Sequence, residues 1–82
     1  MNANVAARRA LEYSKIKGWK RDWSHGGCYL HLEASEFIES LRGKKGDPQK
    51  ELADTLFVLF SIAAEYKLDI EDAIKWVGSK RG

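Results

Sequence analysis

The sequence predicts an all-α fold of four helices in a single domain, residues 1–82. Three observations lead to this expectation. Apolar residues recur with the period of a helix, the glycines and the one proline fall mostly between the periodic segments, and no stretch has the alternation of a strand. A chain of 82 residues suits one domain with a small core, so a partner subunit would help to bury apolar surface.

The first helix is expected from about Asn4 to Lys17, a segment rich in alanine and straight-chain residues, with Gly18 ending it. The loop that follows, residues 18–27, is unusual for a linker because it combines aromatic and basic side chains. The residues of interest in and next to this loop are Lys17, Trp19, Lys20, Arg21, Trp23 and His25.

The second helix is expected from about Tyr29 to Arg42, because its apolar residues form one stripe at about 100° per residue. The third begins at Asp47-Pro48, an acidic N-cap followed by proline at the first helical position. It runs to about Tyr66 and is apolar almost all round after its first turn. We therefore expect this helix to be buried on several sides.

The fourth helix is expected to follow Asp69, which is placed to cap it, and to end in a basic tail. On the third helix, Phe57 and Phe60 point away from the main apolar stripe and need a second cover. A second subunit would supply that cover. The sequence therefore predicts a homodimer or a dimer of dimers, with the third helix central to the interface.

The composition argues against several classes of protein. A net charge of +2 is too small to indicate a nucleic-acid polymer or a membrane as partner. Cys28, which is expected to be buried, has no partner for an intrachain disulfide, and no Cys/His set has zinc-ligand spacing. Arg8 and Arg9 interrupt the apolar core that a signal peptide needs. We expect a cytoplasmic protein.

Two pairs of acidic residues at helical spacing are the main functional signal. Glu33 and Glu36 lie on the second helix, Glu51 and Asp54 on the third, and residues three apart project to the same side. If the helices fold back on each other about Lys45, Glu36 comes level with Asp54. Crowded carboxylates oppose folding, and a divalent cation such as magnesium relieves the repulsion. The competing interpretation is a solvated acidic face.

The segment 32–74 resembles the core of the MazG-like nucleoside triphosphate pyrophosphohydrolases. The family signature places E-E-x-x-E on one helix and E-x-x-D on the next. Here Glu33 and Glu36 match the second and third glutamates, and Glu51 and Asp54 match the E-x-x-D. The Asp-Pro cap and the apolar third helix fit the family as well.

The resemblance implies a four-helix MazG-like bundle with its metal site between helices two and three. It implies that (d)NTP is hydrolysed to the monophosphate and pyrophosphate, with magnesium, or manganese, as cofactor. The implied metal ligands and catalytic residues are Glu33, Glu36, Glu51 and Asp54. Two positions depart from the pattern: Leu32 replaces the first glutamate, as in the dCTP pyrophosphatase branch, and Val77 stands where many relatives carry a lysine.

Basic and aromatic residues outside the acidic pairs are the candidates for holding the substrate. Relatives often place base-contacting residues before the acidic helix, where this chain has Trp19, Trp23 and His25. His25 is expected to bond locally, because magnesium prefers oxygen ligands. Lys44 and Lys45 lie at the wrong end if the base sits near the first helix. The candidate phosphate-binding cations are Lys17, Lys20, Arg21, Lys80 and Arg81.

Two other functions fit the sequence. Phosphoribosyl-ATP pyrophosphatase has a similar size and a comparable pair of acidic motifs, but this chain lacks the lysine-rich approach to the glutamates expected of that enzyme. A non-catalytic helical module would use the apolar third helix to bind a partner. Magnesium dependence separates such a module from either enzyme.

Overall fold

The computed structural model describes residues 2–81, with side chains up to Ser79. Within these residues it has no strand and four helices. The helices are α1 (Ala3–Lys17), α2 (His25–Leu41), α3 (Pro48–Glu65) and α4 (Ile70–Arg81). The predicted all-α class and the number of helices are therefore confirmed.

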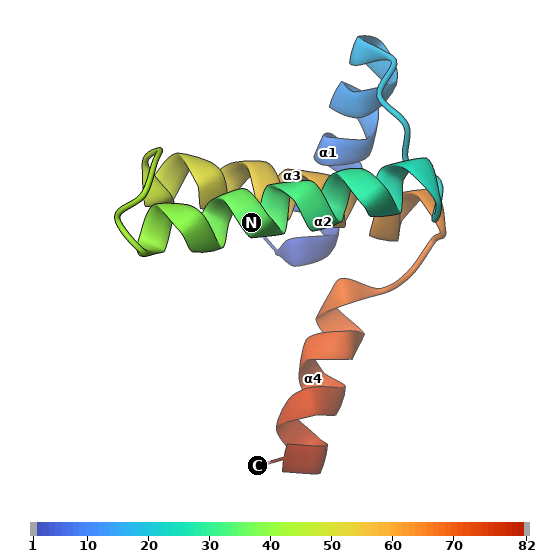
Figure 1. Ribbon diagram of the computed structural model, residues 1–82. Helices are drawn as coiled ribbons and strands as arrows, with labels where there is room; N and C mark the ends of the chain where they lie inside the picture. The colour runs from blue at the N-terminus through green and yellow to red at the C-terminus, as the bar shows by residue number, and fades with distance from the viewer. Residues whose placement is uncertain (1, 82) are drawn as a thin grey trace.

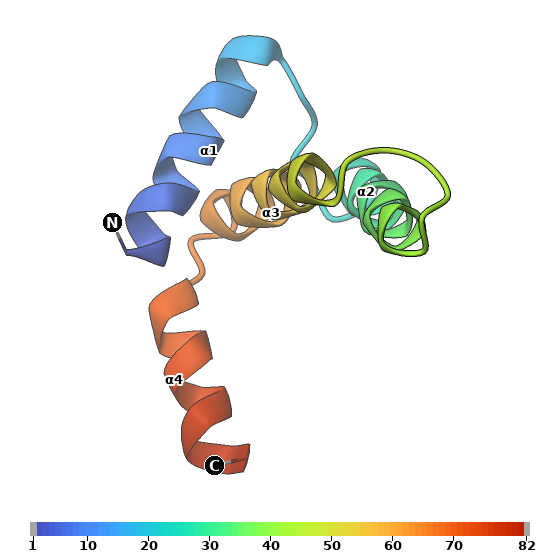
Figure 2. The same ribbon diagram turned by 90° about the vertical axis from the view of Figure 1, so that its left-hand side faces the viewer.

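Helix α3 lies between α2, which runs antiparallel to it, and α1, which crosses its other side (Figure 1; Figure 2). The buried residues of α1 are all small: Ala7, Ala10 and Ser14 recur at three- and four-residue spacing. Val58 and Ser61 are the buried residues of α3. Small side chains on one helix face let two backbones approach closely, which explains why α1 packs on α3.

Local signals set most helix ends as the sequence predicts. Gly18 ends α1 with a φ of +73°, a conformation that glycine adopts without strain. The Asp47 carboxylate accepts a hydrogen bond of 3.0 Å from the backbone N–H of Gln49 and so caps α3. Asp69 does the same for α4 by accepting from the N–H of Asp72 at 2.9 Å.

The start of α2 differs from the prediction, because the helix begins at His25 and includes the two glycines that were expected in the loop. The Asp22 carboxylate accepts hydrogen bonds from the backbone N–H groups of His25 (3.1 Å) and Gly26 (3.3 Å). A Cβ on Gly26 would lie 2.9 Å from the carbonyl carbon of Arg21. Gly26 therefore allows the loop to fold against the first turn of α2.

Helix α4 extends away from the α2–α3 pair and contacts mainly α1 (Figure 1; Figure 2). Asn4 holds its start by accepting a hydrogen bond from the N–H of Ile70 and donating one to Asp69. As a result α3 is less covered than expected, and Leu59 is 43% exposed. Cys28 is exposed, so the prediction that it is buried is wrong. None of the described helices has the length and apolarity needed to cross a membrane.

Candidate metal centre

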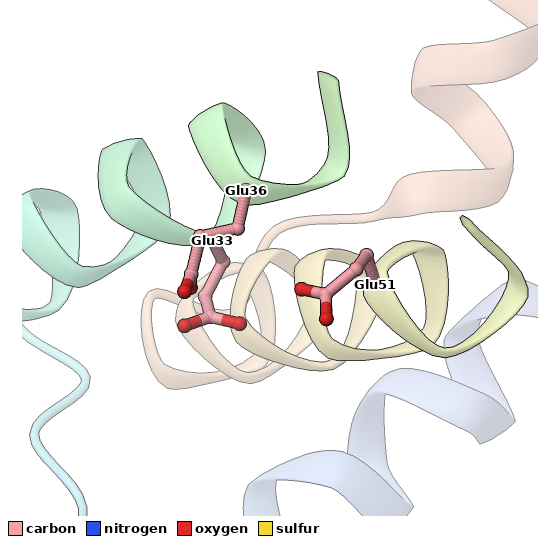
Figure 3. Close-up of side chains that lie close together, drawn as sticks. All are labelled: Glu33, Glu36 and Glu51. Carbon is pink, nitrogen blue, oxygen red and sulfur yellow. The ribbon is translucent and has the colours of Figure 1, made fainter. Parts of the chain in front are cut away.

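Three of the four predicted carboxylates meet between α2 and α3. Glu33 and Glu36 project from α2 toward Glu51 of α3 (Figure 3), and each supplies a carboxylate oxygen within 4.8 Å of the others. Glu33 is only 6% exposed, whereas Glu51 is half-buried and Glu36 is exposed. We call these three residues the acidic cluster. Its oxygen donors and spacing suit a hard divalent cation.

Thr55 fixes the two helices at the level of the acidic cluster. Its hydroxyl lies 3.0 Å from the backbone carbonyl oxygen of Glu33 on α2 and 2.9 Å from that of Glu51 on its own helix. The hydroxyl proton bridges the two carbonyls, which sets the register of α2 against α3. The glutamates therefore meet because a specific contact holds their backbones side by side.

The electrostatics of the acidic cluster are those of crowded, partly desolvated acids. Burial raises the pKa of Glu33 from 4.5 to about 7, helped by a hydrogen bond with Glu36 and by the charges of Glu36, Asp54 and Glu51. Burial and the charges of Glu33, Asp54 and Glu36 also raise the pKa of Tyr29. No ion pair between described side chains involves the acidic cluster.

Asp54, the fourth predicted ligand, lies beside the acidic cluster but is not one of the three mutually close residues. Its side chain is exposed, and its charge contributes to the raised pKa values of Glu33 and Tyr29. Glu36 was expected level with Asp54, and in the structure its carboxylate lies close to those of Glu33 and Glu51. Residues one turn apart on a helix face the same side, so Glu51 and Asp54 both border the site between α2 and α3.

The α2–α3 turn borders the same site. A cavity of about 320 Å³ is lined by Glu36 and Glu51 together with Lys44, Lys45 and Gly46. The sequence analysis set both lysines aside because they lie far from a base held near the first helix. The structure shows that they nevertheless line the same cavity as two of the acids.

Several predicted substrate residues gather where α2 begins and α3 ends. Arg21 donates to the Glu65 carboxylate at 2.7 Å and to the backbone oxygen of Trp19 at 2.8 Å. His25 lies 3.2 Å from Asp22 through Nδ1, so its predicted local bonding is confirmed. Trp19 packs edge-to-face on Phe57, and Tyr13 packs on the same ring. Phe57 is thus covered within the chain, without the second subunit expected for it.

A hollow of about 590 Å³ opens at this end, lined in part by Trp19, Lys20, Arg21 and His25. Trp23 is 79% exposed and donates its backbone N–H to the Tyr66 hydroxyl at 2.8 Å. The Lys17 ammonium lies 5.6 Å from the centre of the Tyr13 ring. The side chains of Lys80 and Arg81 lie outside the described residues.

The hollow and the acidic cluster occupy different positions along α2. Glu33 lies eight positions after His25 in α2, a distance of about 12 Å along the helix axis. Comparisons with protein-family models, curated proteins and solved structures find no match to this chain.

Proposed function

We propose that this chain is a magnesium-dependent nucleotide pyrophosphohydrolase of the MazG-like kind, which cleaves a (d)NTP to the monophosphate and pyrophosphate. The observation that carries the proposal is the acidic cluster. Glu33, Glu36 and Glu51 come from two antiparallel helices, lie within 4.8 Å of one another, and include a carboxylate that is 6% exposed. Such an arrangement is costly without a cation, because like charges in a partly desolvated site repel one another.

The donor set supports magnesium, with manganese as an alternative. All three groups offer oxygen, which both ions accept, and Asp54, whose charge acts on Glu33, would be a fourth ligand beside them. When bound, the ion polarises the phosphate oxygens and lowers the pKa of a coordinated water. The glutamates hold the ion in place and supply a carboxylate that accepts the proton of the attacking water.

The hollow beside α1 supports a place for the base. Trp19 lines the hollow and Trp23 is exposed next to it in the chain, and a base of any identity stacks on an aromatic face. Lys20 and His25 line or border the same hollow and provide polar contacts. Arg21 is committed to Glu65 and Trp19, so we assign it to holding the loop.

The exposed surface supports assembly with a second copy, as a dimer or a dimer of dimers. The chain exposes 6188 Å², against roughly 5,000 Å² for a compact monomer of 9.3 kDa. The excess is larger than the roughly 800 Å² that each partner buries in a standard interface. An apolar groove between α3 and α4, lined by Leu59, Phe60, Ile74 and Val77, is the surface we assign to this contact.

Light scattering at micromolar concentration tests the assembly. The wild type is expected to be at least a dimer, and Ile74→Glu on the groove is expected to shift it toward the monomer. A monomeric wild type would contradict the proposed assembly and would have no bearing on the proposed metal site.

A panel of nucleotides tests the reaction. The four dNTPs, the four NTPs and phosphoribosyl-ATP are each incubated with the protein, with magnesium and with EDTA, and pyrophosphate release is measured. We expect magnesium-dependent release from at least one nucleoside triphosphate. Release from phosphoribosyl-ATP alone would identify the alternative enzyme, and no release from any substrate would favour a non-catalytic interaction module.

A further inference from the structure

The turn between α2 and α3 places two lysines at the acidic cluster. The cavity of about 320 Å³ that contains Glu36 and Glu51 is also lined by Lys44 and Lys45. Both lysines are exposed, and they enter the cavity from the turn, apart from the two helices that carry the acids. Lysines from the turn and the acids Glu36, Glu39 and Glu51 from the two helices therefore line one partly open cavity.

Among the described side chains, the two lysines differ from the neighbouring Arg42, which is engaged in an ion pair. Arg42, just before the turn, donates to the Glu39 carboxylate at 2.8 Å. Neither Lys44 nor Lys45 takes part in an ion pair with a described carboxylate. Their ammonium groups are thus available to an anion that enters the cavity.

Gly46 holds the turn against the acidic cluster. Its φ of +89° is a conformation that favours glycine, and a Cβ at this position would lie 3.1 Å from the Glu51 carboxylate oxygen Oε2. Asp47 then caps α3 and anchors the other side of the turn. The lysine-bearing turn is therefore kept next to the Glu51 carboxylate by backbone geometry.

We propose that Lys44 and Lys45 grip the polyphosphate of the nucleotide next to the acidic cluster, an inference that rests on the proposed function. With Asp54 as a fourth ligand, the carboxylates carry two more negative charges than a divalent cation neutralises, so the loaded site alone would repel a phosphate chain. The two ammonium groups offset that excess negative charge. Val77, which stands where relatives carry a lysine, lines an apolar groove and offers no cation.

The test compares two pairs of substitutions that remove the same charge. Lys44→Ala/Lys45→Ala is expected to raise KM for the nucleotide by about tenfold or more. The Kd for inorganic pyrophosphate, measured by calorimetry at saturating magnesium, is expected to rise by a similar factor. Arg8→Ala/Arg9→Ala, on the exposed part of α1, is expected to leave both constants unchanged. Lys44→Arg/Lys45→Arg keeps the charge and is expected to keep most of the affinity.

A third readout separates loss of phosphate contacts from damage to the metal site. Lys44→Ala/Lys45→Ala is expected to retain the magnesium-induced rise in melting temperature. If the wild type hydrolyses nucleotides and the lysine variant matches Arg8→Ala/Arg9→Ala, the phosphate grip is refuted and the proposed function stands. If the wild type neither hydrolyses nucleotides nor binds pyrophosphate, the proposed function and the phosphate grip are both refuted.

Discussion

The two ends of the α2–α3 pair differ in whether their charged side chains have partners within the chain. Where α2 begins, Arg21 pairs with Glu65, and the Ser24 hydroxyl, with backbone N–H groups, holds the pKa of Asp22 well below its usual range. Toward the turn, Glu33 and Glu36 face another acid, and the pKa of Glu33 rises to about 7. At the first end these charges have partners within the chain, whereas at the second end the acidic cluster has no ion pair among the described side chains, although Arg42 and Glu39 pair beside it.

This difference separates residues whose charges stabilise the fold from residues whose charges we expect a bound ligand to neutralise. A paired charge contributes to stability in the folded chain, although only modestly when it is exposed. An unpaired, buried carboxylate costs stability, and a protein retains such a group when something other than folding requires it.

The largest expected effect is on hydrolysis. Glu36→Ala and Asp54→Ala are each expected to lower kcat/KM by roughly 10³-fold or more, because the site loses an oxygen ligand. Without metal, each variant is expected to be as stable as the wild type or slightly more stable, since repulsion is relieved. Glu12→Ala, an exposed carboxylate on α1, serves as control. Unfolding of Glu36→Ala in metal-free buffer would show that this acid supports the fold.

The next effect is the pH dependence of stability without metal. Unfolded Glu33 ionises near its ordinary pKa of 4.5, whereas folded Glu33 keeps its proton until about pH 7. The folded state therefore binds more protons between these values, and the free energy of unfolding falls as the pH rises, by roughly 2–3 kcal/mol. Urea denaturation at pH 5 and pH 8 measures the slope. Glu33→Gln is expected to flatten it, and an equal slope in that variant would contradict the assignment.

Magnesium is expected to stabilise the wild type at neutral pH. An ion that binds only the folded state adds about 1.4 kcal/mol at ten times its Kd, which raises the melting temperature of a chain this small by several degrees. EDTA should reverse the shift, and Glu36→Ala should abolish it. An unchanged midpoint at millimolar magnesium would count against the acidic cluster as a metal site.

The smallest expected effect is on stability, from the ion pair of Arg21 and Glu65 near the start of α2. Arg21→Ala breaks the ion pair with Glu65 and the contact with the Trp19 carbonyl, and is expected to lower the free energy of unfolding by about 1 kcal/mol. Below its melting temperature the variant should keep wild-type kcat and KM. A raised KM at unchanged stability would instead move Arg21 into the substrate site.

Local chemistry explains which helix ends the sequence predicts well. Gly18, Asp47 and Asp69 act through their own backbone or the first turn of a helix, so their patterns can be read from the sequence. The start of α2 was placed too late because Asp22 caps it from within the loop, and Gly26 lets the loop approach. The path of α4 depends on Asn4, a residue distant in sequence.

The acidic cluster was only partly predictable for a similar reason. Helical spacing pairs Glu33 with Glu36 and Glu51 with Asp54, and antiparallel packing brings the pairs together. Which acids meet, and which one is buried, depends on the rotation of α2 against α3. The Thr55 hydroxyl, bridging two carbonyls across the helices, sets that rotation. Thr55 is the only threonine of the chain, and no pattern in the sequence marks its hydroxyl as a contact between two helices.

Direct titration with manganese tests the central claim most directly, because it needs no knowledge of the substrate. The claim is that the unpaired acids toward the turn form a metal site. Paramagnetic resonance of Mn²⁺ added to the wild type is expected to show one ion taken up per chain and released by excess magnesium. Glu33→Gln/Glu36→Gln is expected to take up none. Equal uptake by this variant, or no uptake by the wild type at millimolar Mn²⁺, would contradict the account.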